Sequence, residues 1–147
     1  MIRYLVLKLI FLPALFLLSC TSSDPAVTGL PLENTKWILK TLNDKKIFIP
    51  ESGKEVYIEF KSVGNKVNGN GGCNTFFGTY TVIKNKLKLG PISKTEIFCE
   101  GIMEVEDNFV MALEKTERYK IKENVLEIYD ALKLIATLEG VPQIRTN

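Results

Sequence analysis

The residues with the most reactive side chains are three cysteines, Cys20, Cys73 and Cys99, in a chain of 147 residues that contains no histidine. A cysteine or serine nucleophile most often relies on a histidine base, and histidine is also a common zinc ligand. The composition therefore excludes Ser-His and Cys-His nucleophile pairs and every histidine-ligated metal site. We expect no catalytic residue, no metal and no cofactor, and predict that the protein is not an enzyme.

A glycine-rich run spans Gly69–Gly78 and includes Gly71-Gly72-Cys73-Asn74. A phosphate-binding loop would end in Gly-Lys-Ser/Thr and lead into a helix, whose N-terminus attracts anions. This run lacks that ending and leads into a strand pattern, so phosphate binding is not expected. Its glycines instead favour a bulge or sharp corner with closely approaching backbones.

Four acidic residues, Glu100, Glu104, Glu106 and Asp107, lie close together in the sequence. They could form an acid/base pair or a Ca²⁺ cluster, but no Asp-x-Asp-x-Asp-Gly loop accompanies them. Acidic side chains also suit the first turns of a helix because they complement its dipole. We therefore expect a solvated helix face.

The N-terminal segment is typical of a signal peptide: Arg3 and Lys8 precede or interrupt an apolar run that ends at Leu18. The run is shorter than the roughly 20 residues of a membrane-spanning helix. The sequence Leu17-Leu18-Ser19-Cys20 resembles a bacterial lipobox, in which the cysteine receives a diacylglycerol and becomes the mature N-terminus. The alternative is a plain secretory signal in residues 1–19. Lipidation of Cys20 is the favoured interpretation, and acyl chains would hold the protein on a membrane.

Residues 20–31 are small and polar with two prolines, which predicts a flexible tether. Thr21 is not the aspartate of an inner-membrane retention signal, and Asp24 alone is a weak surface-export signal. We therefore expect the outer membrane, with the domain facing the periplasm. Once residues 1–19 are removed, basic and acidic residues are equal at 17 each, so no strong field for nucleic acid remains.

The remainder alternates apolar and polar residues with the period of a β-strand, whereas Gly101–Lys115 has apolar residues at helical spacing. This predicts a mainly β (α+β) fold: a curled antiparallel sheet or small barrel-like meander of about eight short strands with one packed amphipathic helix. The domain is expected over residues 32–141, followed by a tail at 142–147. The expected strands are Trp37–Leu42, Val56–Phe60, Lys66–Gly69, Phe77–Ile83, Leu87–Leu89, Tyr119–Ile121, Val125–Tyr129 and Leu132–Leu138.

Four short motifs, followed by the predicted helix and the closing strands, occur in an order that resembles the META domain family, the lipoproteins related to the heat-shock protein HslJ. The resemblance implies a small β-rich, barrel-like fold with a helix, an envelope or stress-linked role and no established enzyme activity. Ile97-Phe98 stands where many members carry Met-Ala, which is a packing difference. The matching residues are Asn34, Thr35 and Trp37, then Gly71, Gly72, Cys73 and Asn74, then Phe76, Gly78 and Tyr80, then Thr95 and Cys99.

If Cys20 is lipidated, Cys73 and Cys99 are the two remaining cysteines, and an even pair in an oxidising compartment favours one disulfide. Two buried free thiols that touch without bonding are the first alternative. A reactive nucleophile is the second, although no histidine is present to generate the thiolate. We predict the disulfide.

The leading hypothesis for function is a non-catalytic binding or interaction module, monomeric, with the membrane and an envelope protein as partners. The alternative is a carrier of a small apolar ligand in the barrel interior, and a third hypothesis is a purely structural accessory. Lys84, Lys86 and Lys88 alternate with other residues and predict a lysine-lined outer face or edge, with contact to anionic lipid as the alternative. The residues that would line either a cavity or a solid core are Ile58, Phe60, Phe76, Tyr80 and Leu89.

Overall fold

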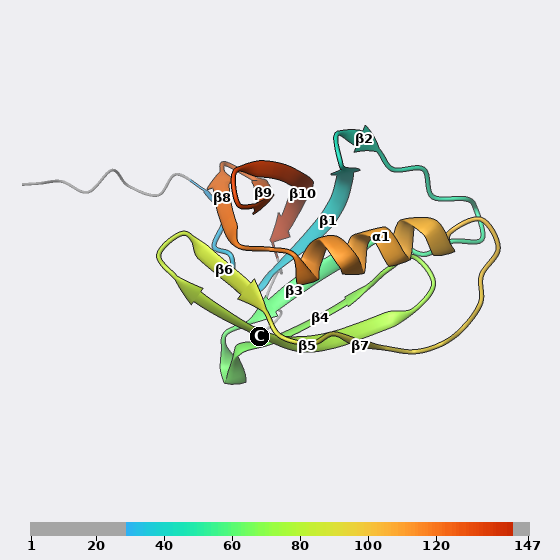
Figure 1. Ribbon diagram of the computed structural model, residues 1–147, viewed down its shortest axis with the longest axis horizontal. Helices are drawn as coiled ribbons and strands as arrows, with labels where there is room; N and C mark the ends of the chain where they lie inside the picture. Colours follow the sequence, from blue (N-terminus) through green and yellow to red (C-terminus); the bar gives the residue numbers. More distant parts are fainter. Residues whose placement is uncertain (1–28, 143–147) are drawn as a thin grey trace, which may run out of the picture.

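The computed structural model describes residues 29–142, which form one antiparallel barrel with a helix (Figure 1). Along the sheet the strands follow the order β10-β9-β8-β6-β5-β4-β3-β1, and β10 pairs with β1 to close the barrel. The barrel strands are β1 (Thr35–Leu42), β3 (Tyr57–Lys61), β4 (Lys66–Asn70), β5 (Thr75–Ile83), β6 (Lys86–Leu89), β8 (Arg118–Lys122), β9 (Val125–Asp130) and β10 (Lys133–Pro142).

The strands that close the barrel, β1 and β10, have the longest pairing, which runs from Thr35↔Pro142 to Leu42↔Ala136. The weakest contact is between β6 and β8, which share the single pair Lys86↔Arg118. Two short strands add to the barrel: β2 (Lys45–Lys46) pairs with β1, and β7 (Ser93–Lys94) pairs with β5. The predicted small barrel with one packed helix is confirmed, and each of the expected strands overlaps a barrel strand.

Large side chains fill the barrel interior. Trp37 and Phe60 are fully buried, and the ring of Phe60 meets that of Tyr80 edge-on at 5.2 Å between centroids. The ring of Phe76 on β5 meets that of Phe109 on the helix at 6.0 Å. Alternate strand residues therefore face a closely packed core, as the period of two requires.

The helix α1 (Met103–Glu114) covers one end of the barrel. Phe109 and Leu113 are fully buried, while Val105 and Val110 are partly buried against the core. This end also carries the β4–β5 and β1–β2 turns (Figure 1). Within residues 29–142 no helix is long and apolar enough to span a bilayer.

The chain from Gly29 to Asn34 covers the opposite end. Gly29 bridges to Glu123 in the β8–β9 turn, and the Leu30 N–H donates to the Glu123 carbonyl at 2.8 Å. The indole N–H of Trp37 donates to the Leu32 carbonyl at 2.9 Å. The last residues of the expected tether, 29–31, thus lie against the barrel, while residues 20–28 lie outside the described part of the chain.

Candidate functional site

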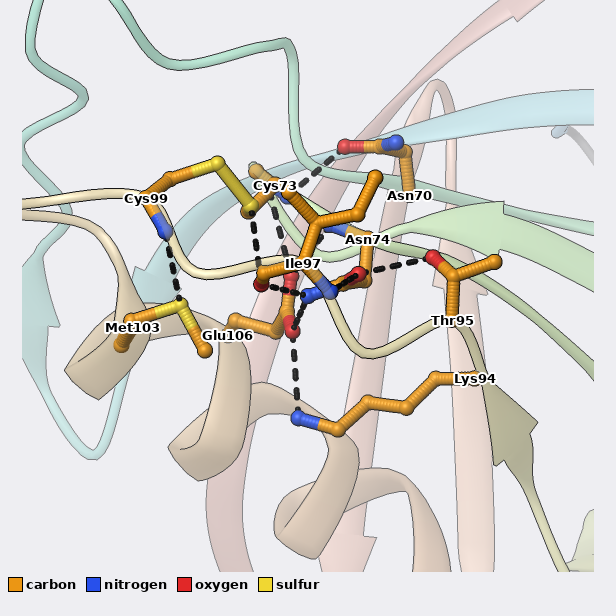
Figure 2. Close-up of a disulfide and its surroundings, with 10 residues drawn as sticks. Asn70, Cys73, Asn74, Lys94, Thr95, Ile97, Cys99, Met103 and Glu106 are labelled. Atoms are coloured by element: carbon orange, nitrogen blue, oxygen red, sulfur yellow. Dashed lines mark hydrogen bonds and ion pairs between the residues drawn. A yellow bond between two sulfur atoms is a disulfide. The ribbon is translucent and has the colours of Figure 1, made fainter.

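The β4–β5 turn and the segment before α1 are joined by a disulfide between Cys73 and Cys99, whose Cα atoms are 5.9 Å apart (Figure 2). The pairing is compatible with the predicted disulfide. Cys73 is buried, at 2 % exposure, and Cys99 is partly exposed. The bond fixes the glycine-rich corner against the start of the helix.

Asn74 lies at the centre of a hydrogen-bond cluster next to this disulfide (Figure 2). Its amide oxygen accepts from the Thr95 hydroxyl at 2.7 Å and from the Ile97 N–H at 2.8 Å. Its amide nitrogen donates to the Ile97 carbonyl at 2.9 Å and to Glu106 Oε1 at 2.7 Å. Both hydrogens and both acceptor sites of the side chain are therefore used.

Glu106 is fully buried, which corrects the expectation that it lies on a solvated helix face. Its Oε2 accepts from the backbone N–H of Asn74 at 2.6 Å and of Cys73 at 3.2 Å. Its Oε1 accepts from the Asn74 amide and from Lys94 Nζ, the latter at 3.1 Å. The neighbouring Glu104 and Asp107 are exposed, as expected. A buried carboxylate is tolerated here because donors surround it.

The electrostatics of Glu106 reflect two opposing effects. Burial alone would raise its pKa, but the hydrogen bonds from Asn74, Lys94 and Cys73 outweigh burial and hold the pKa below the ordinary value of 4.5. The hydrogen bond from Lys94 to Asp107 raises the pKa of that amine, with Glu106 adding to the effect against burial. Both groups therefore stay charged at neutral pH.

We expect Glu106→Gln to change how stability depends on pH. Because the folded-state pKa of Glu106 is depressed, its carboxylate stabilises the fold above pH 4.5 and loses this contribution as pH falls through the lower folded-state pKa. The difference in unfolding free energy between the wild type and Glu106→Gln should be largest near neutral pH and shrink in acid. Urea unfolding at a series of pH values measures it.

Glu104→Gln is the matched control, because Glu104 is exposed on the same helix. Its unfolding free energy should stay within about 0.5 kcal/mol of the wild type. A difference between the wild type and Glu106→Gln that is constant down to acid pH would contradict the role of the Glu106 charge.

The glycines of the corner leave room for Glu106 and the helix. A Cβ at Gly71 would lie 2.4 Å from Glu106 Cγ, and a Cβ at Gly72, whose φ is +113°, would lie 2.5 Å from Ile102 Cγ1. These glycines allow the turn backbone to approach the carboxylate closely enough to donate to it.

Gly71→Ala should lower the free energy of unfolding by about 2 kcal/mol, because the added methyl group displaces the buried Glu106 side chain. Gly64→Ala is the control: Gly64 also lies in a turn, with φ +74°, but the nearest atom to an added Cβ is the flexible Lys66 side chain at 3.5 Å. Its cost should be limited to backbone strain of about 1 kcal/mol. Equal melting temperatures for Gly71→Ala and the wild type would refute the close packing.

The other motif residues take structural positions. Trp37 and Phe76 are core side chains, and the Tyr80 hydroxyl donates to Glu33 Oε1 at 2.5 Å near the opposite end of the barrel. Burial and the Glu33 carboxylate raise the pKa of Tyr80. The Thr35 hydroxyl donates to the Pro31 carbonyl at 2.7 Å. Gly78 lies in β5, where it pairs with Val67 of β4.

Two residues of the cluster were not singled out correctly from the sequence, Glu106 and Lys94. Glu106 follows Ile102 by four residues and precedes Phe109 by three, so it lies on the apolar stripe of the helix. That position was the signal for its burial. Lys94 lies in the two-residue strand β7, whose pattern is too short to interpret. Cys20 and the lipobox lie outside the described residues.

Within residues 29–142, side chains fill the barrel interior. Ile58, Phe60, Phe76 and Tyr80 are at most 2 % exposed, and Leu89 packs partly buried against them. These side chains form a solid core. On the outer surface of β4 and β5 there is instead a groove of about 740 Å³, lined by residues that include Asn34, Asn68 and the half-exposed Phe77.

We call the Cys73–Cys99 disulfide, together with Asn74, Glu106 and their hydrogen bonds, the brace, because it holds the corner against the helix. Within residues 29–142 every buried side-chain nitrogen and oxygen has a hydrogen-bond partner, and no group of three cysteine or acidic residues is placed to hold a metal. The Glu106 carboxylate has four donors, which leaves it no free position for a substrate proton. The arrangement stabilises the corner, and its carboxylate and both sulfur atoms are already engaged with other groups of the cluster.

Known proteins with a similar sequence pattern or structure support the barrel fold. The model of the META domain matches residues 30–140. The NMR structure of a protein from Burkholderia xenovorans is 20% identical with a TM-score of 0.63, over 76% of this chain and 85% of that one. A second NMR structure is 18% identical with a TM-score of 0.59, over 74% of this chain and 90% of the other. At these identities the likeness shows the fold alone. No curated protein matches.

Proposed function

This chain belongs to the META domain family, and from that premise we propose that it is a lipid-anchored bacterial envelope protein whose domain is a non-catalytic interaction module linked to envelope stress. The anchor in this proposal is Cys20, and the domain faces the periplasm from the outer membrane. Membrane lipid and an envelope protein are the proposed partners of the monomer.

The main support for a non-catalytic role is that the residues of the family-motif cluster are all bonded to one another. Cys73 and Cys99 are bonded to each other, Asn74 uses all of its hydrogen-bonding positions, and Glu106 is enclosed by donors. An active site keeps a nucleophile, acid or base accessible to substrate. The cluster has the opposite arrangement, which supports a structural role for the most distinctive residues of the chain.

The support for an anchor comes from the sequence Leu17-Leu18-Ser19-Cys20 and from the spacing to the domain. Cys20 lies nine residues before Gly29, where the chain reaches the barrel. Nine residues extend over at most about 30 Å, so a lipid at Cys20 would keep the domain close to the membrane.

Complementation of a deletion strain under envelope stress tests this proposal. The wild-type chain should restore growth, and the double variant Cys73→Ala/Cys99→Ala should restore it equally wherever its abundance equals that of the wild type. Cys20→Ala, which lacks the lipid acceptor, should fail to restore growth while the domain remains folded.

Abundance and disulfide state are measured in the same cells, so that stability and function are separated. A double cysteine variant that is as abundant as the wild type and fails to complement would contradict the non-catalytic role and indicate a redox function. Full complementation by Cys20→Ala would contradict the need for the anchor.

The groove on β4 and β5 supports a second candidate function, the binding of a small ligand. Its volume of about 740 Å³ falls within the range of ligand sites, and Phe77 gives it an apolar wall. Native mass spectrometry of the intact chain should then show a retained adduct that Phe77→Ser removes. A bare chain after mild purification would count against this candidate.

A further inference from the structure

Six basic side chains gather on the outer face of the barrel where β6 meets β8, and we name them the basic seam. Along β6 they alternate with the inward-facing Leu87, and along β8 with Tyr119 and Ile121, which pack against the core. All except the partly exposed Arg118 are exposed. The basic seam consists of Lys84, Lys86, Lys88, Arg118, Lys120 and Lys122.

Like charges face each other across this seam. Lys86 pairs directly with Arg118, and the backbone bond from the Tyr119 N–H to the Asn85 carbonyl continues the contact toward the β5–β6 turn, which contains Lys84. Like charges at directly opposed positions destabilise a sheet. Within the described part of the chain none of the six forms an ion pair, whereas Lys36, Lys40, Lys61 and Lys94 each do.

Acidic side chains near the seam are fewer than the cations. Glu117 lies beside Lys86, Lys88 and Arg118 in a shallow hollow, and Glu127 on β9 is opposite Lys120. Glu127 also accepts a hydrogen bond from the Tyr129 hydroxyl at 2.7 Å. Glu123 lies in the turn that follows Lys122. The local surface is therefore positive although the chain after residue 19 carries equal numbers of both charges.

The seam lies at the end of the barrel where the chain arrives from Cys20. Gly29 pairs with Glu123, next to Lys122 at the end of β8, and Figure 1 shows β8 and the β5–β6 turn on the same side of the molecule as the start of the described chain. Cys20 is nine residues upstream, within about 30 Å at full extension. A lipid at Cys20 would hold this surface near the headgroups.

Apolar side chains accompany the cations at the tip of the β5–β6 hairpin. Ile83 is 71 % exposed and directly precedes Lys84, and Val82 is 37 % exposed. Exposed aliphatic residues flanked by lysines suit the boundary between headgroups and acyl chains, where the apolar part is buried and the ammonium groups meet phosphates.

We propose that the basic seam is the membrane-facing surface of the domain and binds the headgroups of anionic phospholipids. The proposal rests on the lipid anchor at Cys20 proposed above and adds an orientation: the β5–β6 hairpin and β8 face the bilayer, while the disulfide and the start of α1 lie on the far side. Anionic headgroups would neutralise the like charges that oppose each other across the seam. Each basic residue near such a surface strengthens binding about fivefold, and the effect falls off within a Debye length.

The test uses the full chain, purified with its native N-terminal modification and reconstituted into vesicles. One set of vesicles is phosphatidylcholine, and the other contains phosphatidylglycerol as about a third of its lipid. A water-soluble acetylating reagent is added, and the rate of modification of each lysine is followed by peptide mass spectrometry. Lys120 and Lys122 are the reporters in the seam, and Lys45, Lys46 and Lys54 at the α1 end are the references.

We expect acetylation of Lys120 and Lys122 to be at least about threefold slower on the anionic vesicles than on phosphatidylcholine, with unchanged rates at the three references. Salt at about 1 M, where the Debye length is about 3 Å, should remove the protection. The triple variant Lys84→Gln/Lys86→Gln/Lys88→Gln should also lose it. The matched variant Lys45→Gln/Lys46→Gln/Lys54→Gln, which removes the same charge at the other end, should retain it.

The outcomes test the basic seam and the lipid anchor independently of each other. An intact mass without acyl groups overturns the anchor and the orientation built on it. A lipidated chain whose seam lysines react equally fast on both kinds of vesicle, or whose protection survives the seam variant, overturns the basic seam alone. Protection of seam and reference lysines to the same extent also overturns it, because the domain would then have no preferred face.

Discussion

Cys73→Ser should lower the free energy of unfolding by about 3.5 kcal/mol. The disulfide to Cys99 closes a loop with a sequence separation of 26 residues, and the chain-entropy model assigns a stabilisation of this size to such a loop. For a domain of this length the melting temperature should fall by about 15 °C. Thermal unfolding in oxidising buffer, followed by circular dichroism, measures the effect.

Reductant supplies the control. The wild type in reductant should melt close to Cys73→Ser, and the double variant Cys73→Ser/Cys99→Ser should add little to the single change, because both remove the same bond. Cys73→Ser that melts at the wild-type temperature in oxidising buffer would show that the bond does not stabilise the fold.

Asn74→Ala should have an effect of similar size, about 3 to 5 kcal/mol. The variant removes the acceptor of the Ile97 N–H and of the Thr95 hydroxyl and one donor to the buried Glu106 carboxylate. Each buried polar group left without a partner costs about 1 to 3 kcal/mol, and a charged one costs more. Chemical denaturation at neutral pH measures the loss.

Asn68→Ala is the matched control for Asn74→Ala. Asn68 lies in β4, a few residues earlier, and is only partly buried. Its side chain has no hydrogen bond among those described for residues 29–142, so its removal should change stability by no more than about 0.5 kcal/mol. Equal losses for the two variants would show that the Asn74 network contributes nothing specific.

The barrel strands could be predicted because each has one face in the core. In Val56–Phe60 the alternate residues Val56, Ile58 and Phe60 are all fully buried. The link between β3 and β4 contains Gly64 and Asn65, two residue types that tolerate the positive φ that both adopt in the structure. The strands β2 and β7 have two residues each, which is too few for any period to appear.

The cluster at the disulfide could be predicted only in part, and the reason is specific to Glu106. A carboxylate on a helix is usually solvated, and the sequence does not reveal that a turn 32 residues earlier presents its N–H groups at that point. The apolar positions Ile102 and Phe109 on either side mark the correct face of the helix. The resemblance to the family identified Cys73, Asn74, Thr95 and Cys99, but not the carboxylate that joins them.

The brace and the basic seam lie at opposite ends of the barrel, so the two ends of the domain differ in charge and in rigidity. The disulfide and Glu106 fasten the end that α1 covers, and the six cations lie where the chain enters from Cys20. In the proposed orientation the membrane side is positive and the far side is rigid. The far side is then available to an envelope partner.

The intact mass of the protein extracted from membranes, with and without reductant, tests both the lipid anchor and the disulfide that joins the β4–β5 turn to the segment before α1. We expect a chain that begins at Cys20, carries a diacylglycerol, and is short by two hydrogens that return on reduction. An unmodified N-terminus would contradict the anchor. A mass that reductant does not change would contradict the bond between Cys73 and Cys99.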